Sequence, residues 1–74
     1  MNVIGRASGT SCTFRVSLKS GVWSVSKDGT FYGDYLSRAQ AIASACLGAR
    51  TVEARGGASR VVAGKTEQVV PHHL

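Results

Sequence analysis

The chain has 74 residues, of which 43% are hydrophobic and 18% charged, a balance that predicts one folded domain and argues against a disordered chain. A core this small leaves little room for a deep substrate cleft. The net charge of +5 favours an anionic partner, either nucleic acid or an acidic protein face, although it also serves solubility. The sequence shows neither a membrane span nor a secretory leader, so the expected location is the cytoplasm, with Cys12 and Cys46 reduced.

The predicted domain organisation is simple. Residues 1–11 are rich in Gly, Ser and Thr and are expected to form a flexible N-terminal arm. Residues 12–71 carry the hydrophobic patterns of a single α+β domain. Residues 72–74 are expected to be a C-terminal tail in solvent.

The first predicted strand covers residues 13–19, where apolar and polar side chains alternate. Ser20 and Gly21 can form a two-residue turn, because Gly tolerates positive φ. This turn places Leu18 opposite Trp23. The apolar side chains of both strands then share one face, as a hairpin requires.

A second tight turn is predicted at Asp28 and Gly29, a pair typical of type I′ hairpins. It returns a third strand over residues 30–33, with Tyr32 beside Val25 on the core side. The three strands form a meander with one buried face. The residues expected on that face are Phe14, Val16, Leu18, Trp23, Val25 and Tyr32.

A helix is predicted to begin at Ser37, whose side chain can cap the amide of Gln40 while Gln40 reaches back, as in a capping box. Leu36 is expected to pack on Ala41. Small and apolar residues then recur on one helical face, which indicates that the helix lies close to the sheet. These residues are Ala39, Ile42, Cys46 and Ala49.

Two interpretations of Gly48 lead to different helix ends. In one, the helix stops there, residues 51–55 form a strand, and Gly56 and Gly57 form a hairpin turn. We favour the other, in which the helix continues to Ala54 and the glycine pair ends it. Gly48 then lies on the outward face, at a cost of about 1 kcal/mol relative to Ala.

A closing hairpin is predicted from residues 59–63 and 67–70, joined by a loop at residues 64–66 that places Val61 opposite Val69. The predicted fold class is therefore α+β. An antiparallel sheet, built from the three-stranded meander and the C-terminal hairpin, carries one helix packed on one face.

We expect no catalytic residue, metal or cofactor, and the chain is not predicted to be an enzyme. The turn containing Lys65 resembles the end of a phosphate-binding loop, but Ser59 stands where that loop requires Gly. His72 and His73 are adjacent in the predicted tail and lack convergent ligands. Cys46 is expected to be a small core residue, whereas Cys12 is expected to be exposed.

Basic side chains around an exposed aromatic residue make the outer face of the meander the best candidate surface for binding. A second basic group lies along the helix and just beyond it. An ordinary solvated surface is the alternative interpretation for both groups. The candidate partner-binding residues are Arg15, Lys19, Lys27 and Phe31 on the meander, and Arg38, Arg50, Arg55 and Arg60 in the second group.

The strand around Trp23, the turn ending in Gly29, the alanine-rich helix after Ser37 and the closing strand at Val61 and Val62 together resemble a short bacterial domain family of unknown function. The resemblance covers roughly residues 13–70. It implies the fold just described, and the family has no catalytic residues to carry over.

In size and predicted topology the chain is also similar to small anti-CRISPR-type inhibitors from phages and mobile elements. That resemblance implies a non-catalytic protein that sterically blocks a host nucleic-acid-targeting complex. The open edge expected on so small a sheet is compatible with a monomer or a homodimer. Many such inhibitors are acidic, and the charge of +5 departs from that pattern. The alternative is a basic module that binds DNA or RNA directly through its exposed sheet face.

Overall fold

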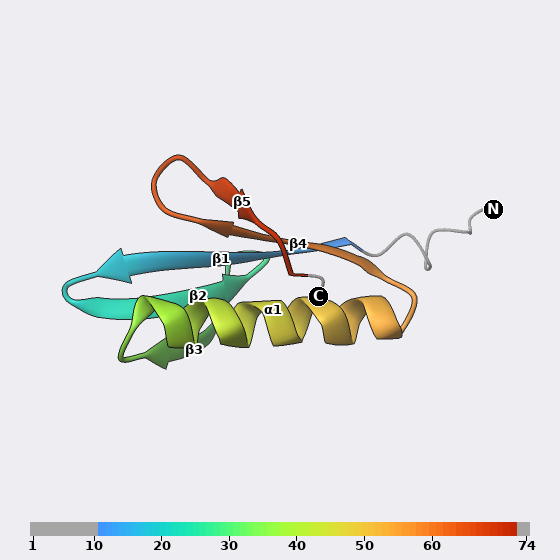
Figure 1. The fold of residues 1–74 in the computed structure, drawn as a ribbon, viewed down its shortest axis with the longest axis horizontal. Coiled ribbons are helices and arrows are strands. Elements are labelled where there is room, and N and C mark those ends of the chain that lie inside the picture. The colour runs from blue at the N-terminus through green and yellow to red at the C-terminus, as the bar shows by residue number, and fades with distance from the viewer. Residues whose placement is uncertain (1–10, 73–74) are drawn as a thin grey trace.

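Residues 11–72, the part of the chain that the computed structural model describes, form an α+β fold. The elements are β1 (Ser11–Lys19), β2 (Val22–Lys27), β3 (Thr30–Tyr35), α1 (Arg38–Ala54), β4 (Ala58–Ala63) and β5 (Gln68–Val70). The strands form one sheet in the order β3-β2-β1-β4-β5, and α1 lies along one side of it (Figure 1). No helix among these residues has the length and apolar character needed to cross a membrane.

Both tight turns of the meander form as predicted. Ser20 and Gly21 have φ values of 51° and 79°, and Asp28 and Gly29 have values of 53° and 84°. Positive φ at both central positions gives a turn whose twist matches that of the flanking strands. The register of β1 with β2 is also the predicted one, so their apolar side chains share the face beneath α1.

The third strand is longer than predicted and contains a β-bulge. Val25 pairs with Gly33 instead of Tyr32, because the register shifts by one residue after Val25. The ring of Tyr32 instead meets that of Phe14 edge-on, with their centroids 5.3 Å apart. The predicted pairing of Val25 with Tyr32 is therefore wrong.

The sheet is mixed, which corrects the prediction of a purely antiparallel one. β4 runs parallel to β1, with Phe14 opposite Val61. The meander occupies only one edge of β1, and α1 then carries the chain back along the sheet, so that β4 enters in the same direction as β1 (Figure 1). Parallel neighbours need such a long crossover connection. β1 consequently becomes the central strand.

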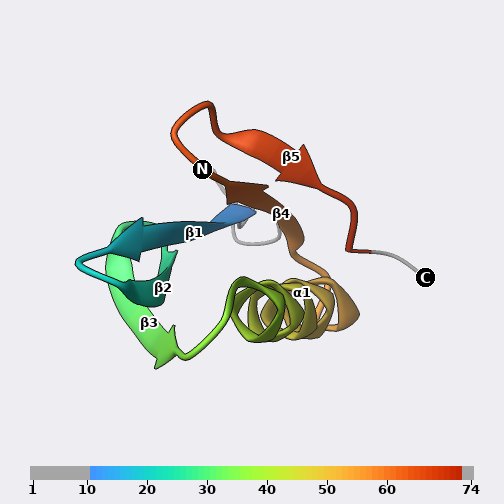
Figure 2. The ribbon, with the colours of Figure 1, turned by 60° about the vertical axis from the view of Figure 1, so that its left-hand side comes forward.

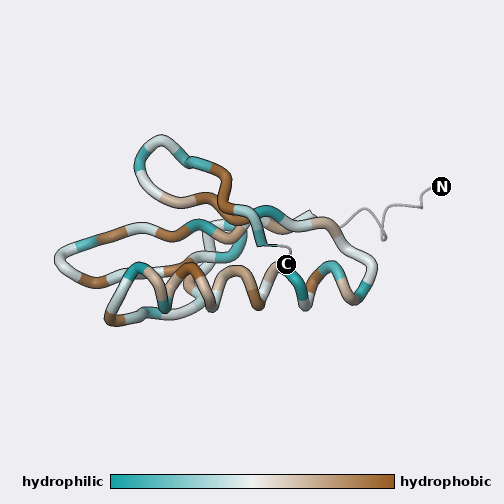
Figure 3. The backbone as a smooth tube through the Cα atoms, viewed as in Figure 1, coloured by the Kyte–Doolittle hydropathy of each residue, from teal (hydrophilic) through white to brown (hydrophobic). Residues whose placement is uncertain are grey.

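The hydrophobic core lies between α1 and the inner face of the sheet. The largest fully buried side chains of the sheet are Phe14, Val16, Val25 and Val61. The helix contributes small residues to the core: Ala41, Ala45, Cys46 and Ala49. Figure 3 shows that apolar residues are spread along α1. Three residues predicted in the core, Leu18, Tyr32 and Ala39, are exposed, and Trp23 is only partly buried.

Gly48 faces the core, which corrects its predicted outward position. A Cβ atom at this position would lie 2.8 Å from Cε2 of Phe14 and 2.9 Å from the hydroxyl oxygen of Tyr32. Contacts that short require a neighbour to move. The glycine therefore provides the space in which two aromatic side chains meet the helix.

The start of α1 agrees with the prediction in part. The Ser37 hydroxyl accepts a hydrogen bond from the amide of Gln40 at 3.1 Å. The Gln40 side chain reaches back, but it accepts from the amide of Leu36, at 3.3 Å, and not from that of Ser37 as in a capping box. Leu36 is 95% exposed, so the predicted packing on Ala41 is wrong.

The long helix is confirmed, and the glycine pair ends it. Gly56 has a φ of 93°, and its amide donates to the carbonyl of Glu53. The amide of Gly57 donates to the carbonyl of Val52. These two hydrogen bonds form a Schellman motif, which satisfies carbonyl groups at the helix end.

The closing hairpin forms with a different register. Val61 pairs with Val70 and Val62 pairs with Val69, so the predicted pair of Val61 with Val69 is wrong. The connection covers residues 64–67, one residue more than predicted. Adding one residue to the loop shifts the pairing by one position.

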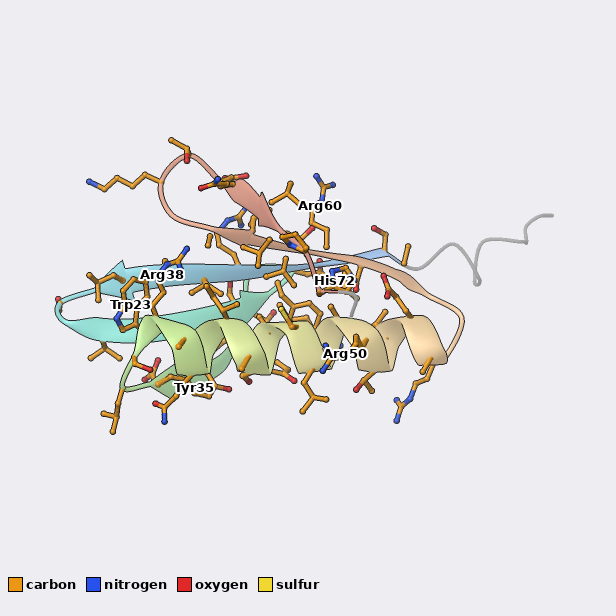
Figure 4. The ribbon with its side chains drawn as sticks, viewed as in Figure 1. Trp23, Tyr35, Arg38, Arg50, Arg60 and His72 are labelled. Atoms are coloured by element: carbon orange, nitrogen blue, oxygen red, sulfur yellow. The ribbon has the colours of Figure 1, made fainter. Side chains whose placement is uncertain are left out.

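The two ends of the described chain also differ from expectation. Ser11, predicted in the N-terminal arm, begins β1, whereas residues 1–10 lie outside the described residues. His72, predicted in a solvated tail, is buried, and its Nε2 lies 2.9 Å from Oε2 of Glu53. The Arg50 guanidinium donates to the carbonyl of His72 at 3.2 Å (Figure 4). These contacts hold the segment after β5 against α1.

A candidate binding groove on the open sheet face

The face of the sheet opposite α1 carries polar side chains. In Figure 2, α1 lies on one side of the sheet, and β4 and β5 continue the twisted sheet beyond β1. The alternation along β1 and β2 turns five residues toward this open face. They are Arg15, Ser17 and Lys19 on β1, and Ser24 and Ser26 on β2.

The open face is hollowed into a groove with a volume of about 940 Å³. The three serines of β1 and β2 form its floor, because their side chains are short. Phe31 of the edge strand β3 borders the groove on one side, and Lys65 and Glu67 of the β4–β5 loop border it on the other. Leu18 and Trp23 line the end beside the first turn.

One row of the sheet crosses this groove. Phe31 pairs with Ser26, Ser26 pairs with Arg15, and Arg15 pairs with Val62. Phe31 and Arg15 therefore flank a serine, two strand spacings apart, or about 10 Å between Cα atoms. The aromatic ring and the cation lie on opposite sides of a shallow channel.

The charged side chains that line the groove are mostly positive. Arg15, Lys19 and Lys65 are cations, and Glu67 is the single acid among the lining residues, which leaves a net charge of +2. NH2 of Arg15 lies 3.1 Å from Oε1 of Glu67, and their side chains are 41% and 58% exposed. A pair this exposed contributes at most about 1 kcal/mol to stability.

Arg15 also has an unused donor. Its Nε atom is buried and has no hydrogen-bond partner among the described residues. A buried donor of this kind costs about 1–3 kcal/mol, more than the exposed ion pair supplies. The buried Nε is out of reach of an external ligand, so a ligand in the groove would meet only the exposed part of the Arg15 side chain.

Asp34 on β3 is a second acid on this face. Its Oδ1 atom accepts a hydrogen bond from the Ser24 hydroxyl at 2.7 Å. The carboxylate lies toward the edge of the sheet and does not line the groove. It limits how far the positive surface extends beyond β2.

The structure brings together half of the candidate residues from the sequence. Arg15, Lys19 and Phe31 line the groove. Arg60 shares the open face, since it lies two residues before Val62 on β4, and in Figure 4 it points away from α1. Its cation lies beyond the groove.

The other four candidate residues lie away from the groove. Lys27 was predicted on the outer face of the meander or at its rim, but its Nζ lies 5.9 Å from the ring centroid of Phe14, on the face covered by α1. Arg38 and Arg50 belong to α1, and Arg55 caps its C-terminal end. The predicted outer-face cluster thus loses Lys27, and the second basic group does not form one surface.

Sequence reasoning missed the residues that the closing hairpin adds. Lys65 was considered only as part of a phosphate-loop pattern, and Glu67 only as part of a strand. Both reach the groove because β4 pairs beside β1, a long-range contact that no local pattern shows. The Gly64-Lys65 turn itself was a visible sign of a loop that could carry a cation.

Neither cysteine has the surroundings of a reactive thiol. Burial raises the pKa of Cys46 above its usual range. Burial, together with a hydrogen bond to Asp28, raises that of Cys12, which is buried and not exposed as predicted. A raised pKa lowers the fraction of the nucleophilic thiolate. Between residues 11 and 72, no cluster of three or more His, Cys, Asp or Glu residues could hold a metal ion.

Comparisons with known proteins add no family: no family model, curated protein or solved structure matches this chain. The two resemblances drawn from the sequence stay predictions. The function proposed for the chain is therefore argued from the groove itself.

Proposed function

We propose that this chain is a non-catalytic binding module that holds nucleic acid against its open sheet face. The observation that carries the proposal is the groove, in which three cations and an exposed aromatic ring surround a floor of serines. Cations bind phosphates, hydroxyl groups donate to phosphate oxygens, and aromatic rings stack on bases. The net charge of +5 adds attraction at longer range.

The Arg15–Glu67 pair makes the charge of the ligand testable. An anionic ligand competes with Glu67 for the guanidinium of Arg15, so removal of the acid should favour such a ligand. A cationic or neutral ligand would gain nothing from the same change. The substitution Glu67→Gln keeps the size of the side chain and removes its charge.

The test is a titration of fluorescently labelled DNA and RNA, single-stranded and duplex, followed by fluorescence anisotropy at several salt concentrations. Binding should weaken linearly on a log–log plot as salt increases, because counterions are released from the phosphates. Lys65→Gln should weaken binding and reduce the salt slope by about 1. Glu67→Gln should strengthen binding about 2- to 5-fold, the range for one exposed charge.

Arg55→Gln is the matched control, since it removes one positive charge at the end of α1, outside the groove. It should change binding much less than Lys65→Gln does. The proposal is overturned if no nucleic acid binds at low salt, or if Lys65→Gln and Arg55→Gln weaken binding equally.

A second proposal is steric inhibition of a nucleic-acid-targeting complex through a protein contact, of the kind that anti-CRISPR proteins make. The observation that favours it is the exposure of apolar side chains at and along the helix, where Leu36 is 95% and Leu47 59% exposed. A partner that covers these exposed apolar side chains would remove them from water, which favours a protein contact. If nucleic-acid binding fails in the titration, this proposal becomes the leading one.

A further inference from the structure

We infer that the nucleic acid in the groove is single-stranded, an inference that rests on the proposed function and names its substrate. The geometry points to this class because the aromatic ring, the serine floor and the cations form consecutive layers across the sheet. A single strand can present both a base face and a phosphate to those layers at once.

The first step concerns Phe31. Its side chain is 69% exposed, although it belongs to a strand of the sheet. Exposure of a large aromatic ring costs free energy in water, because its apolar surface stays hydrated. A base stacked on the ring would cover that surface, and every base has a face that can do so.

The second step is the spacing across the groove. Phe31 and Arg15 lie about 10 Å apart at their Cα atoms, with Ser26 between them. A nucleotide whose base stacks on Phe31 can therefore direct its phosphate toward Arg15. Lys65, on the same side as Arg15, is placed to meet a neighbouring phosphate.

The third step excludes the duplex as the best ligand. In a duplex, the faces of the bases are already stacked on their neighbours, so Phe31 finds no free base. The serine floor is also recessed between its two borders, so a duplex resting on those borders would meet Phe31 and Lys65 with its backbone and would not reach the floor. Duplex binding would then be purely electrostatic and independent of Phe31.

The experiment compares a fluorescently labelled oligothymidine strand with a labelled duplex of equal length, using the full chain and following fluorescence anisotropy. Stacking is worth about 1–3 kcal/mol per base, so Phe31→Leu should weaken binding of the single strand about 5- to 150-fold. The same change should leave duplex binding unaltered. Phe31→Tyr, which keeps the ring, should restore the affinity.

The outcomes separate this inference from the proposed function. If the duplex binds as tightly as the single strand, or if Phe31→Leu has no effect on the single strand, the inference is wrong while nucleic-acid binding stands. If neither nucleic acid binds, the proposed function fails. If polyglutamate binds with the affinity of the single strand, the groove recognises acidic protein segments and both proposals are overturned.

Discussion

At the scale of single residues, Gly48 shows how a side chain that is absent organises the core. The ring of Phe14 and the hydroxyl of Tyr32 occupy the volume that a methyl group would need. Helix propensity alone predicts that Gly48→Ala stabilises the protein by about 1 kcal/mol. The packing predicts the opposite sign, because overpacking a core costs about 1–3 kcal/mol.

We therefore expect Gly48→Ala to lower the free energy of unfolding by up to about 2 kcal/mol, as the packing cost exceeds the gain in propensity. Urea denaturation of the purified variant measures the change. Leu47→Ala, at an exposed neighbouring position, serves as the control and should change stability little. A stabilised Gly48→Ala variant would contradict the inward orientation of this position.

The sequence does not reveal the orientation of Gly48, because alanines occur all around the helix. Ala41, Ala45 and Ala49 are buried, whereas Ala39 and Ala43 are exposed. A helical face is recognised by the contrast between large apolar and polar residues, and alanine supplies little contrast. The positions of Ser37 and Gly56 were predictable, since each performs a local task that few residues can do.

At the scale of secondary structure elements, β5 depends on the segment that follows it. The strand has only three residues and lies at the edge of the sheet. The contacts of His72 with Glu53 and Arg50 fix the chain after the strand to α1. The thiol of Cys46 also approaches the carbonyl oxygen of Pro71, at 3.9 Å.

We expect His72→Ala to destabilise the protein by about 1–2 kcal/mol, because it removes a buried side chain and a hydrogen bond to a carboxylate. This loss is at the lower end of the range for a hydrogen bond to a charged group, because the Glu53 side chain is 27% exposed. Thermal denaturation followed by circular dichroism measures the loss, and Gln68→Ala, at an exposed position of β5, is the reference. Equal midpoints for the two variants would mean that His72 does not anchor the strand.

The hairpin with the Ser20-Gly21 turn was predictable down to its register, and the Asp28-Gly29 hairpin only next to its turn, whereas the register of the hairpin with the longer connection was not predictable. Asp28 and Gly29 specify a turn in which both residues have positive φ, so only one register is available. The loop at residues 64–67 contains Gly64 and Glu67 with positive φ, and the sequence does not show that Glu67 belongs to the loop. The bulge at Tyr32 was not predictable either, because no local sequence signal marks it. It accompanies the contact of the Tyr32 ring with Phe14.

At the scale of the whole molecule, the central position of β1 follows from long-range pairing. Each strand of the meander pairs with its neighbour in sequence, so the class of the fold could be predicted. The placement of β4 beside β1 could not, because no nearby residue specifies it. The floor and the aromatic border of the groove come from the meander and could be predicted. The lysine border comes from the β4–β5 loop and could not.

The rate of amide hydrogen exchange should follow the position of each strand in the sheet. β1, β2 and β4 all have strands on both sides, but β1 lies furthest from the two edges and its amides should exchange most slowly, followed by those of β2 and β4, with the edge strands β3 and β5 exchanging fastest. Measurement by NMR resolves the strands individually. Exchange of β4 as fast as that of β3 would contradict the parallel pairing at the centre of the sheet.

The parallel insertion of β4 has a consequence for association. β4 and β5 form a contiguous C-terminal unit, joined to α1 through Gly56 and Gly57. This unit fills the free side of β1 equally well whether β1 belongs to its own chain or to a second copy. Reciprocal exchange of the unit would preserve the native contacts outside the hinge within a dimer, and the glycine pair would be the hinge of such a domain swap.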